Sequence, residues 1–238
     1  MRNYIRLFIP PIFFQLKWIF LKRINSNKIK PDPHLIESYS QYGEDLVLDG
    51  IFRGKMKGFY IDIGAHDPEF QSNTLRFYMR GWQGINIEPI VSKYNKFQVV
   101  RERDININCG VHNEHAELTF YHSEWETLST FNKERALKNA KNFNKEIIGE
   151  YKIPVKRLSE ILGANMRDDQ HIDFLSIDTE GNELNILKGN DWKKYRPQVI
   201  LIETADQEID IHEYLVVNNY SLVFKNHLNS IYLDKQKA

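Results

Sequence analysis

The sequence predicts an α/β fold, in which a mostly parallel, doubly wound sheet carries helices on both faces. Two observations predict this class: short apolar runs of strand length recur along the chain, and helix-length segments separate them. Strands that alternate with helices in this way usually pair in parallel through crossover connections. Two late runs, at residues 220–225 and 230–233, predict a C-terminal antiparallel strand pair.

The expected elements follow one another from residue 58 onward. Buried strands are predicted at residues 58–63, 84–89, 105–111, 172–178 and 199–203, and helices at residues 73–80, 91–101, 183–188 and 211–218. Gly81 and Gly189 are expected to end two of these helices. In the middle of the chain, the pattern of apolar residues is less regular. Residues 117–122 are typical of a strand, whereas the lysine-rich residues 132–150 predict a polar helix, either solvated or a lid over the substrate.

Length, charge and cysteine content limit the classes of protein to consider. The 238 residues are enough for one sizeable core with appendages. Because 32 basic side chains balance 32 acidic ones, no global field selects a polyanion, and we expect no nucleic-acid partner. Cys109 is the single cysteine and cannot form an internal disulfide, which favours a reducing, cytoplasmic compartment and a thiol packed in the core.

The first residues differ in character from the rest. Residues 1–28 interleave apolar and basic side chains, but Lys17 interrupts the apolar run and Pro10 precedes a second proline, so neither a spanning helix nor a signal peptide is predicted. We expect an amphipathic helical segment on the inner face of a membrane, or else one packed on the domain or on a second subunit. Two prolines in residues 29–34 predict a linker, which gives an N-terminal segment at 1–34 and a catalytic domain at 35–238.

Acidic and glycine residues follow the first two predicted strands. Asp62 and Gly64 close the first strand, and Glu88 closes the second about two dozen residues later. In open α/β sheets, ligands bind beyond the carboxyl ends of strands; a carboxylate at the second position accepts ribose hydroxyls. Glycine lets the backbone approach a ligand closely, and an adjacent carboxylate can neutralise an ammonium group. The pair therefore predicts a cofactor site.

The turn after the first strand discriminates between cofactors. A dinucleotide fingerprint needs three glycines around a pyrophosphate, whereas residues 64–69 hold Gly64 alone together with the carboxylates of Asp67 and Glu69. These acids would repel a pyrophosphate and favour a cationic cofactor with one ribose, such as S-adenosylmethionine. A nicotinamide-dependent sugar dehydrogenase is the alternative enzyme, and a noncatalytic, membrane-tethered module of glycan assembly is the alternative outside enzymes.

Five short motifs at these positions resemble those of the FkbM-type methyltransferases. The resemblance spans roughly residues 38–234, and its motifs are Ser40-Gln41-Tyr42-Gly43-Glu44-Asp45, Asp62-Ile63-Gly64-Ala65-His66, Ser72-Asn73-Thr74, Gly81-Trp82 with Gly84-Ile85-Asn86-Ile87-Glu88-Pro89, and Asp178-Thr179-Glu180-Gly181-Asn182-Glu183. It implies a Rossmann-like class I methyltransferase fold, S-adenosylmethionine as donor, and methyl transfer to oxygen, frequently on a sugar. Pro68 and Asn182 stand where the family commonly has glycine and histidine.

The resemblance also implies roles for individual residues of the cofactor site. Residues around the first loop would line the donor's amino-acid part, the next motif would hold its carboxylate, and the acid after the second strand would bind its ribose. By position, these cofactor residues are Asp62, Gly64, Ala65, His66, Ser72, Asn73, Thr74, Glu88 and Pro89.

The reacting end is expected after the fourth strand. Methyl transfer to an alcohol needs a base for the hydroxyl proton, and Asp178 or Glu180 could serve, with His66 as the competing choice. Asp178, Glu180 and Glu203 could also hold a divalent cation, Mg²⁺ or Mn²⁺, with hard oxygen ligands. Alternatively, Glu180 and Glu183 merely cap the helix that they begin.

These features predict an O-methyltransferase for a saccharide, in a glycan or a glycan precursor of the cell surface. Among the aromatic residues, we expect Trp125 to contact the acceptor, because it lies in the irregular segment before the polar helix.

Overall fold

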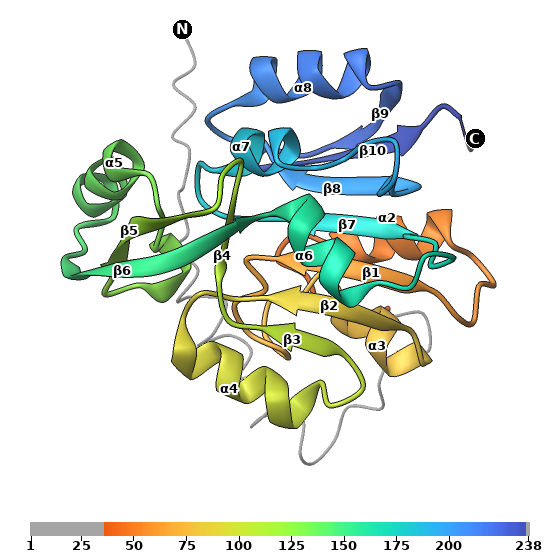
Figure 1. Cartoon of the computed structure of the whole chain (residues 1–238), viewed down its shortest axis with the longest axis horizontal. Helices are drawn as coiled ribbons and strands as arrows, with labels where there is room; N and C mark the ends of the chain where they lie inside the picture. The colour runs from red at the N-terminus through yellow and green to blue at the C-terminus, as the bar shows by residue number, and fades with distance from the viewer. Residues whose placement is uncertain (1–35, 237–238) are drawn as a thin grey trace, which may run out of the picture. The chain divides into compact units, whose positions relative to one another are not determined.

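The computed structural model describes residues 36–236, in which the main sheet has seven strands in the order β3-β2-β1-β7-β8-β10-β9 (Figure 1). The strand order turns back between β1 and β7: from β1 the chain proceeds through β2 to β3 on one side, and from β7 to β8 on the other. β10 runs antiparallel to both of its neighbours, β8 and β9. The strands are β1 (Phe59–Ile63), β2 (Gln83–Ile87), β3 (Ile105–Ile107), β7 (Phe174–Ile177), β8 (Val199–Glu203), β9 (Tyr220–Lys225) and β10 (Asn229–Asp234).

Helices cover both faces of this sheet, as the alternation of buried side chains along the strands requires. Ile61 and Ile63 of β1 belong to one apolar cluster with α6 (Leu158–Asn165), α7 (Glu183–Lys188) and α8 (Glu208–Val217). Tyr60, one position along, belongs to a second cluster with α2 (Glu44–Ile51) and α3 (Leu75–Arg80). The remaining helix of the main domain, α4 (Val91–Val100), joins β2 to β3.

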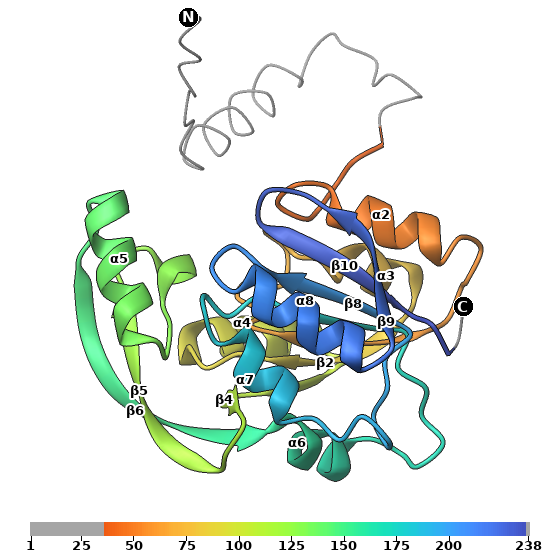
Figure 2. The ribbon, with the colours of Figure 1, turned by 90° about the horizontal axis from the view of Figure 1, so that it is seen from above.

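A smaller unit is inserted between β3 and α6. Its sheet has the order β4-β6-β5, formed by β4 (Gly110–His112), β5 (Ala116–Ser123) and β6 (Ile147–Arg157). Between β5 and β6 lie the short helix η1 (Glu126–Leu128) and α5 (Lys133–Phe143). We call residues 113–157 the insertion; Figure 2 shows its hairpin and α5 standing together beside the main sheet.

The predicted fold class is confirmed, and the predicted strands and helices of the main domain are present, whereas α2 and α6 were not predicted. Two predictions need correction. Residues 105–111 form two strands in different sheets, because the side chain of Asn108 turns away to donate to the carbonyl oxygens of Glu88 and Pro89. Residues 132–150 are not one helix: α5 ends before Asn144, which has a left-handed φ of 51°, and β6 begins at Ile147.

The amphipathic segment expected at residues 1–28, the linker that follows it, and the division at residues 34 and 35 lie outside the described residues. Within residues 36–236, the structure contains no helix that is both long and apolar enough to cross a membrane.

Candidate active site

The candidate site lies at the carboxyl ends of four neighbouring parallel strands. Ile63 of β1 is in register with Ile87 of β2 on one side and with Ile177 of β7 on the other. The residues that follow these three strands therefore emerge side by side. Ile177 is in register with Ile202 of the next strand, β8, which ends one residue later at Glu203. This edge, at the turning point of the strand order, is where open α/β sheets bind ligands.

Gly64 brings the loop after β1 against the loop after β7. Its backbone has a φ of +75°, which disfavours side chains, and its N–H donates to the carbonyl of Ile87 at 3.0 Å. A Cβ atom at this position would overlap the carbonyl oxygen of Asp178. Asp178 in turn donates its N–H to the carbonyl of Ile63 at 3.0 Å. The glycine thus permits a close backbone approach between the cofactor loop and the predicted reaction centre.

Glu88 is buried, and backbone groups orient its carboxylate. The N–H of His66 donates to Oε2 at 2.8 Å, and the N–H of Ile90 donates to Oε1 at 2.7 Å. Burial raises the pKa of Glu88 from 4.5 to about 7, although these two hydrogen bonds act in the opposite direction. Each oxygen keeps a further lone pair, so the ionised carboxylate can accept the two hydroxyls of a ribose.

Asp62 holds the loop that follows it. Its Oδ2 accepts a hydrogen bond from Thr74 Oγ1 at 2.9 Å, and the hydroxyls of Ser72 and Thr74 lie 3.3 Å apart. Burial raises the pKa of Asp62, against the effect of the Thr74 hydrogen bond. Asn73 donates from Nδ2 to Ser176 Oγ at 3.2 Å. The structure therefore brings the predicted cofactor motifs together, and Asp62 acts on the loop of the second motif.

Arg101, which follows α4, is a buried residue that contacts this loop and that the sequence did not single out. Its guanidinium donates to the carbonyl of Pro68 from Nε at 3.0 Å and from Nη2 at 2.6 Å, and to Ser72 Oγ at 3.1 Å. An arginine at the end of a polar helix gives no signal for such a role in the sequence. These bonds fix the path of residues 66–73 over the sheet edge.

His66 is half-buried at a left-handed φ of 51°. Burial lowers the pKa of His66 from 6.5 to about 4, helped by the positive charge of Lys93. Its imidazole is therefore neutral at pH 7 and can accept a proton. Lys93 also forms an ion pair with Glu126 of the insertion at 2.9 Å, so the insertion reaches the cofactor side of the site.

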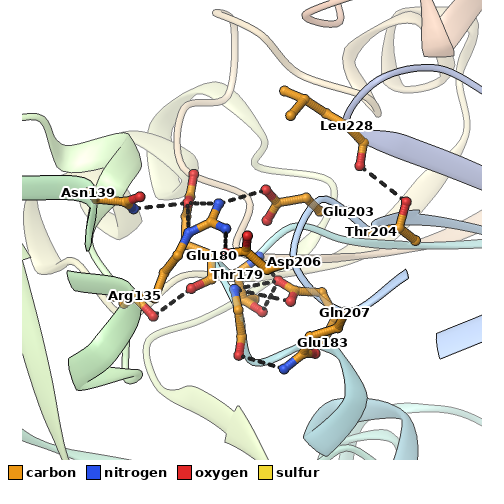
Figure 3. Close-up of polar contacts among 12 residues, drawn as sticks. Arg135, Asn139, Thr179, Glu180, Glu183, Glu203, Thr204, Asp206, Gln207 and Leu228 are labelled. Atoms are coloured by element: carbon orange, nitrogen blue, oxygen red, sulfur yellow. Dashed lines mark hydrogen bonds and ion pairs between the residues drawn. The ribbon is translucent and has the colours of Figure 1, made fainter. Parts of the chain in front are cut away.

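A cluster of carboxylates follows β7 and β8. Asp178, Glu180 and Glu203 each place one carboxylate oxygen within 4.8 Å of the others. Arg135 of α5 bridges two of them: its Nη2 lies 2.7 Å from Glu180 Oε2 and 3.0 Å from Glu203 Oε1 (Figure 3). Its Nη1 is paired with Asp206. The three residues proposed for a cation are thus adjacent, and a guanidinium lies beside them.

Burial and mutual repulsion change the acidity of this cluster. Burial, followed by the charges of Glu180 and Glu183, raises the pKa of Asp178 well above its usual value. Burial and the charge of Asp178 raise the pKa of Glu203 in the same way. For Glu180, burial also raises the pKa, but the charge of Arg135 opposes it. One oxygen, Glu203 Oε2, is buried and has no hydrogen-bond partner among the described residues.

Glu183 and Glu180 have different tasks at the start of α7. The carboxylate of Glu183 accepts from the backbone N–H of Thr179 at 2.9 Å and from that of Gly181 at 3.0 Å, so it holds the loop before the helix and does not cap the helix itself. Glu180 instead has a left-handed φ of 58° and directs its carboxylate to Arg135. Its carbonyl accepts from Thr130 Oγ1 of the insertion at 2.8 Å.

Trp125 packs within the insertion. Its ring centroid lies 6.0 Å from that of Phe143, and the Nζ atom of Lys145 lies 5.2 Å from the ring. Its side chain is half-buried by these contacts. The expectation that it contacts the acceptor stays a prediction.

Three features define the class of S-adenosylmethionine-dependent class I methyltransferases. The strand order turns back between β1 and β7, and an antiparallel β10 lies near one edge of the sheet. A glycine loop follows the first strand, and an acidic residue suited to ribose follows the second. A family model described as the methyltransferase FkbM domain matches residues 62–222. The chain belongs to this family, as its motifs predicted. Family membership favours methyl transfer over the dehydrogenase alternative. No curated protein matches the chain.

Among solved structures, the chain is similar to the methyltransferase FkbM from Methylobacillus flagellatus KT, with 17% identity and a TM-score of 0.51 over 77% of this chain and 45% of that one. The chain thus spans less than half of the length of that protein, and the likeness concerns the fold. Lower scores relate it to a TehB-like methyltransferase from Corynebacterium glutamicum (TM-score 0.43, 9% identity, 94% and 97% covered). An O-methyltransferase from Bacillus cereus in complex with SAH scores 0.41, with 13% identity and 95% and 92% covered.

Proposed function

We propose that this chain transfers the methyl group of S-adenosylmethionine to a hydroxyl oxygen of a saccharide, in a glycan or a glycan precursor. One observation carries the proposal: the Gly64 loop lies directly against Asp178, so a donor-binding loop and a candidate base are adjacent. The donor would place its ribose at Glu88 and its amino-acid part near residues 64–74. Its methyl group would then face Asp178, the first residue after β7.

The transfer is an in-line displacement in which the acceptor oxygen attacks the methyl carbon from about 3 Å. The carbon–sulfur bond breaks as the carbon–oxygen bond forms, the sulfonium becomes a neutral thioether, and the hydroxyl proton passes to a base. Asp178 is the best-placed base, because no hydrogen bond from the described residues engages its carboxylate. Glu180 is held by Arg135 and Asn139, and neutral His66 is the competing acceptor of the proton.

The insertion is the element best placed to contact the acceptor. It meets both halves of the site, through Glu126 with Lys93 on the cofactor side and through Arg135 with Glu180 on the reaction side. A saccharide offers hydroxyls that carboxylates accept, and its apolar ring faces stack on aromatic side chains such as Trp125. This combination of carboxylates and aromatic rings supports a hydroxyl group of a saccharide as the acceptor.

The composition of residues 1–28 supports a location at the cytoplasmic face of a membrane, where the acceptor would be held. The basic side chains of Lys17, Lys22 and Arg23 would attract anionic lipid. The full chain should sediment with anionic vesicles, and replacement of these three residues by glutamine should weaken that binding. Equal binding of both proteins to anionic vesicles would contradict this location.

Incubation with a labelled methyl donor tests the function. The purified chain, labelled S-adenosylmethionine and the glycan fraction of a lysate should yield label in saccharide, and Glu88→Ala should abolish it at low donor concentration. Label in protein or small aromatic products instead would overturn the acceptor class. If calorimetry detected no donor binding up to millimolar concentration, the noncatalytic module would be the better conclusion.

A further inference from the structure

We infer that Asp178, Glu180 and Glu203 bind one divalent cation, Mg²⁺ or Mn²⁺, at the reacting end of the site. This inference deepens the proposed function and rests on it for the role of the ion, although not for its binding. The three residues follow β7 and β8, two paired strands, and their nearest oxygens lie within 4.8 Å of one another. An ion about 2.1 Å from each oxygen needs spacings of up to about 4.2 Å, so small side-chain rotations suffice.

An unpartnered oxygen points to a ligand in this cluster. Glu203 is 6% exposed, and its Oε2 atom has no hydrogen-bond partner among the described residues. Buried polar atoms nearly always have a partner, and an acceptor without one costs about 1–3 kcal/mol. The other oxygen of the same carboxylate accepts from Arg135, which holds the side chain in this orientation. A cation supplies what that oxygen lacks.

The charges of the cluster agree with a divalent ion. With every group ionised, three carboxylates and the single guanidinium of Arg135 leave a formal charge of −2. Because Arg135 also pairs with Asp206, it neutralises little of the charge on the other carboxylate oxygens of the cluster (Figure 3). The guanidinium contacts Oε2 of Glu180 and Oε1 of Glu203, and it does not contact the second oxygen of either carboxylate. Arg135 thereby orients two ligands from one side.

The ion would serve the transfer by binding the acceptor hydroxyl. Three protein oxygens leave open positions in the octahedral shell that Mg²⁺ prefers. A hydroxyl in one of them would be oriented toward the donor, and its proton would pass more easily to the Asp178 oxygen that does not bind the ion, because the ion stabilises the alkoxide. A sugar with two neighbouring hydroxyls fits this arrangement best, since both oxygens can bind the same ion.

Electron paramagnetic resonance of Mn²⁺ tests the site without donor or acceptor. The full chain should bind about one Mn²⁺ and lose it to excess Mg²⁺. Glu203→Gln, which keeps the shape of the side chain, should weaken binding at least about tenfold. Glu160→Gln is the matched control, because Glu160 pairs with Arg157 and touches neither the three ligands nor Arg135, and it should bind within about twofold of the wild type.

Two results would overturn the site: free Mn²⁺ in the presence of excess wild-type protein, or Glu203→Gln binding as tightly as the wild type. If circular dichroism shows that Glu203→Gln is unfolded, Asp178→Asn takes its place. Calorimetry with S-adenosylmethionine separates this failure from that of the proposed function. If the donor binds and Mn²⁺ does not, only the proposed cation site is wrong, and Arg135 is then the cation of this cluster. If Mn²⁺ binds and the donor does not, the proposed methyl transfer is wrong.

Discussion

The Arg135 guanidinium links two carboxylates that follow different strands of the main sheet, since its Nη2 lies 2.7 Å from Glu180 Oε2 and 3.0 Å from Glu203 Oε1. Arg135 belongs to α5, so one side chain ties the insertion to the edge where the reaction is proposed. The pairs are largely shielded from water, and the charge of Glu180 raises the pKa of Arg135 against the effect of burial.

Replacement of Arg135 by glutamine should therefore lower the free energy of unfolding by about 2 kcal/mol, because two charge-assisted hydrogen bonds are lost and the carboxylates then repel each other. Urea unfolding measures the change. Arg157→Gln is the matched control: its pair with Glu160 is exposed, and its loss should change the free energy by less than about 0.5 kcal/mol. Equal effects of the two variants would show that the Arg135 bridge does not stabilise the insertion.

Glu88 should make the stability of the free protein depend on pH. Burial raises its pKa from 4.5 to about 7, so folding favours the protonated carboxyl. Its contribution is complete below pH 4.5 and is lost as the pH rises to about 7. His66 acts in the opposite sense: its pKa falls to about 4, so its contribution is present above pH 6.5 and lost as the pH falls.

The free energy of unfolding of the wild type minus that of Glu88→Gln isolates the carboxyl, because both proteins keep His66. This difference should fall by about 3 kcal/mol between about pH 4.5 and pH 7.5. Donor affinity should change in the other direction in the wild type, rising toward pH 7 as the carboxylate ionises. A difference that is flat with pH would mean that folding does not raise the pKa of Glu88.

The sequence predicted the arrangement of residues at the carboxyl ends of β1 and β2 well because its signals are local. Gly64 and Glu88 each follow a short apolar run directly, and parallel pairing then brings their strands together. The same logic placed Asp178 and Glu203 after neighbouring strands, where the structure has them close to each other. Arg135 was missed because its partners lie 45 and 68 residues further along the chain. No local pattern records such a pairing.

The insertion was predicted less well, for a reason visible in β6. Most of this strand is exposed, and Val155 is its only buried residue. Without a buried face, the alternation of apolar and polar residues that marks a strand is weak, and polar composition favours a loop or a solvated helix. Pairing with β5, from Ala116 with Val155 to Ser123 with Ile147, determines its structure instead.

Gly64→Ala should disrupt both the fold and donor binding. The added methyl would overlap the carbonyl oxygen of Asp178, which belongs to the backbone and cannot rotate away. We expect a loss of about 3 kcal/mol or more in the free energy of unfolding, together with weaker donor binding. Gly81→Ala is the control: it also has a positive φ, but no atom lies within 4 Å of the new methyl group, so its cost should be about 1 kcal/mol. Thermal unfolding and calorimetry compare the two.

Kinetics of Asp178→Asn and His66→Gln distinguish the two candidate bases. Asp178→Asn keeps the shape of the side chain and removes the proton acceptor, so kcat should fall by about 10²- to 10⁴-fold while the dissociation constant of the donor changes little. His66→Gln should keep more than about a tenth of the activity. Since burial holds the pKa of His66 at about 4, the imidazole is neutral across the working range, and kcat of the wild type at saturating donor should show no inflection near pH 6.5 that His66→Gln removes. If His66→Gln lost as much activity as expected for Asp178→Asn, and Asp178→Asn stayed active, the imidazole would be the base and the carboxylate would only orient the acceptor.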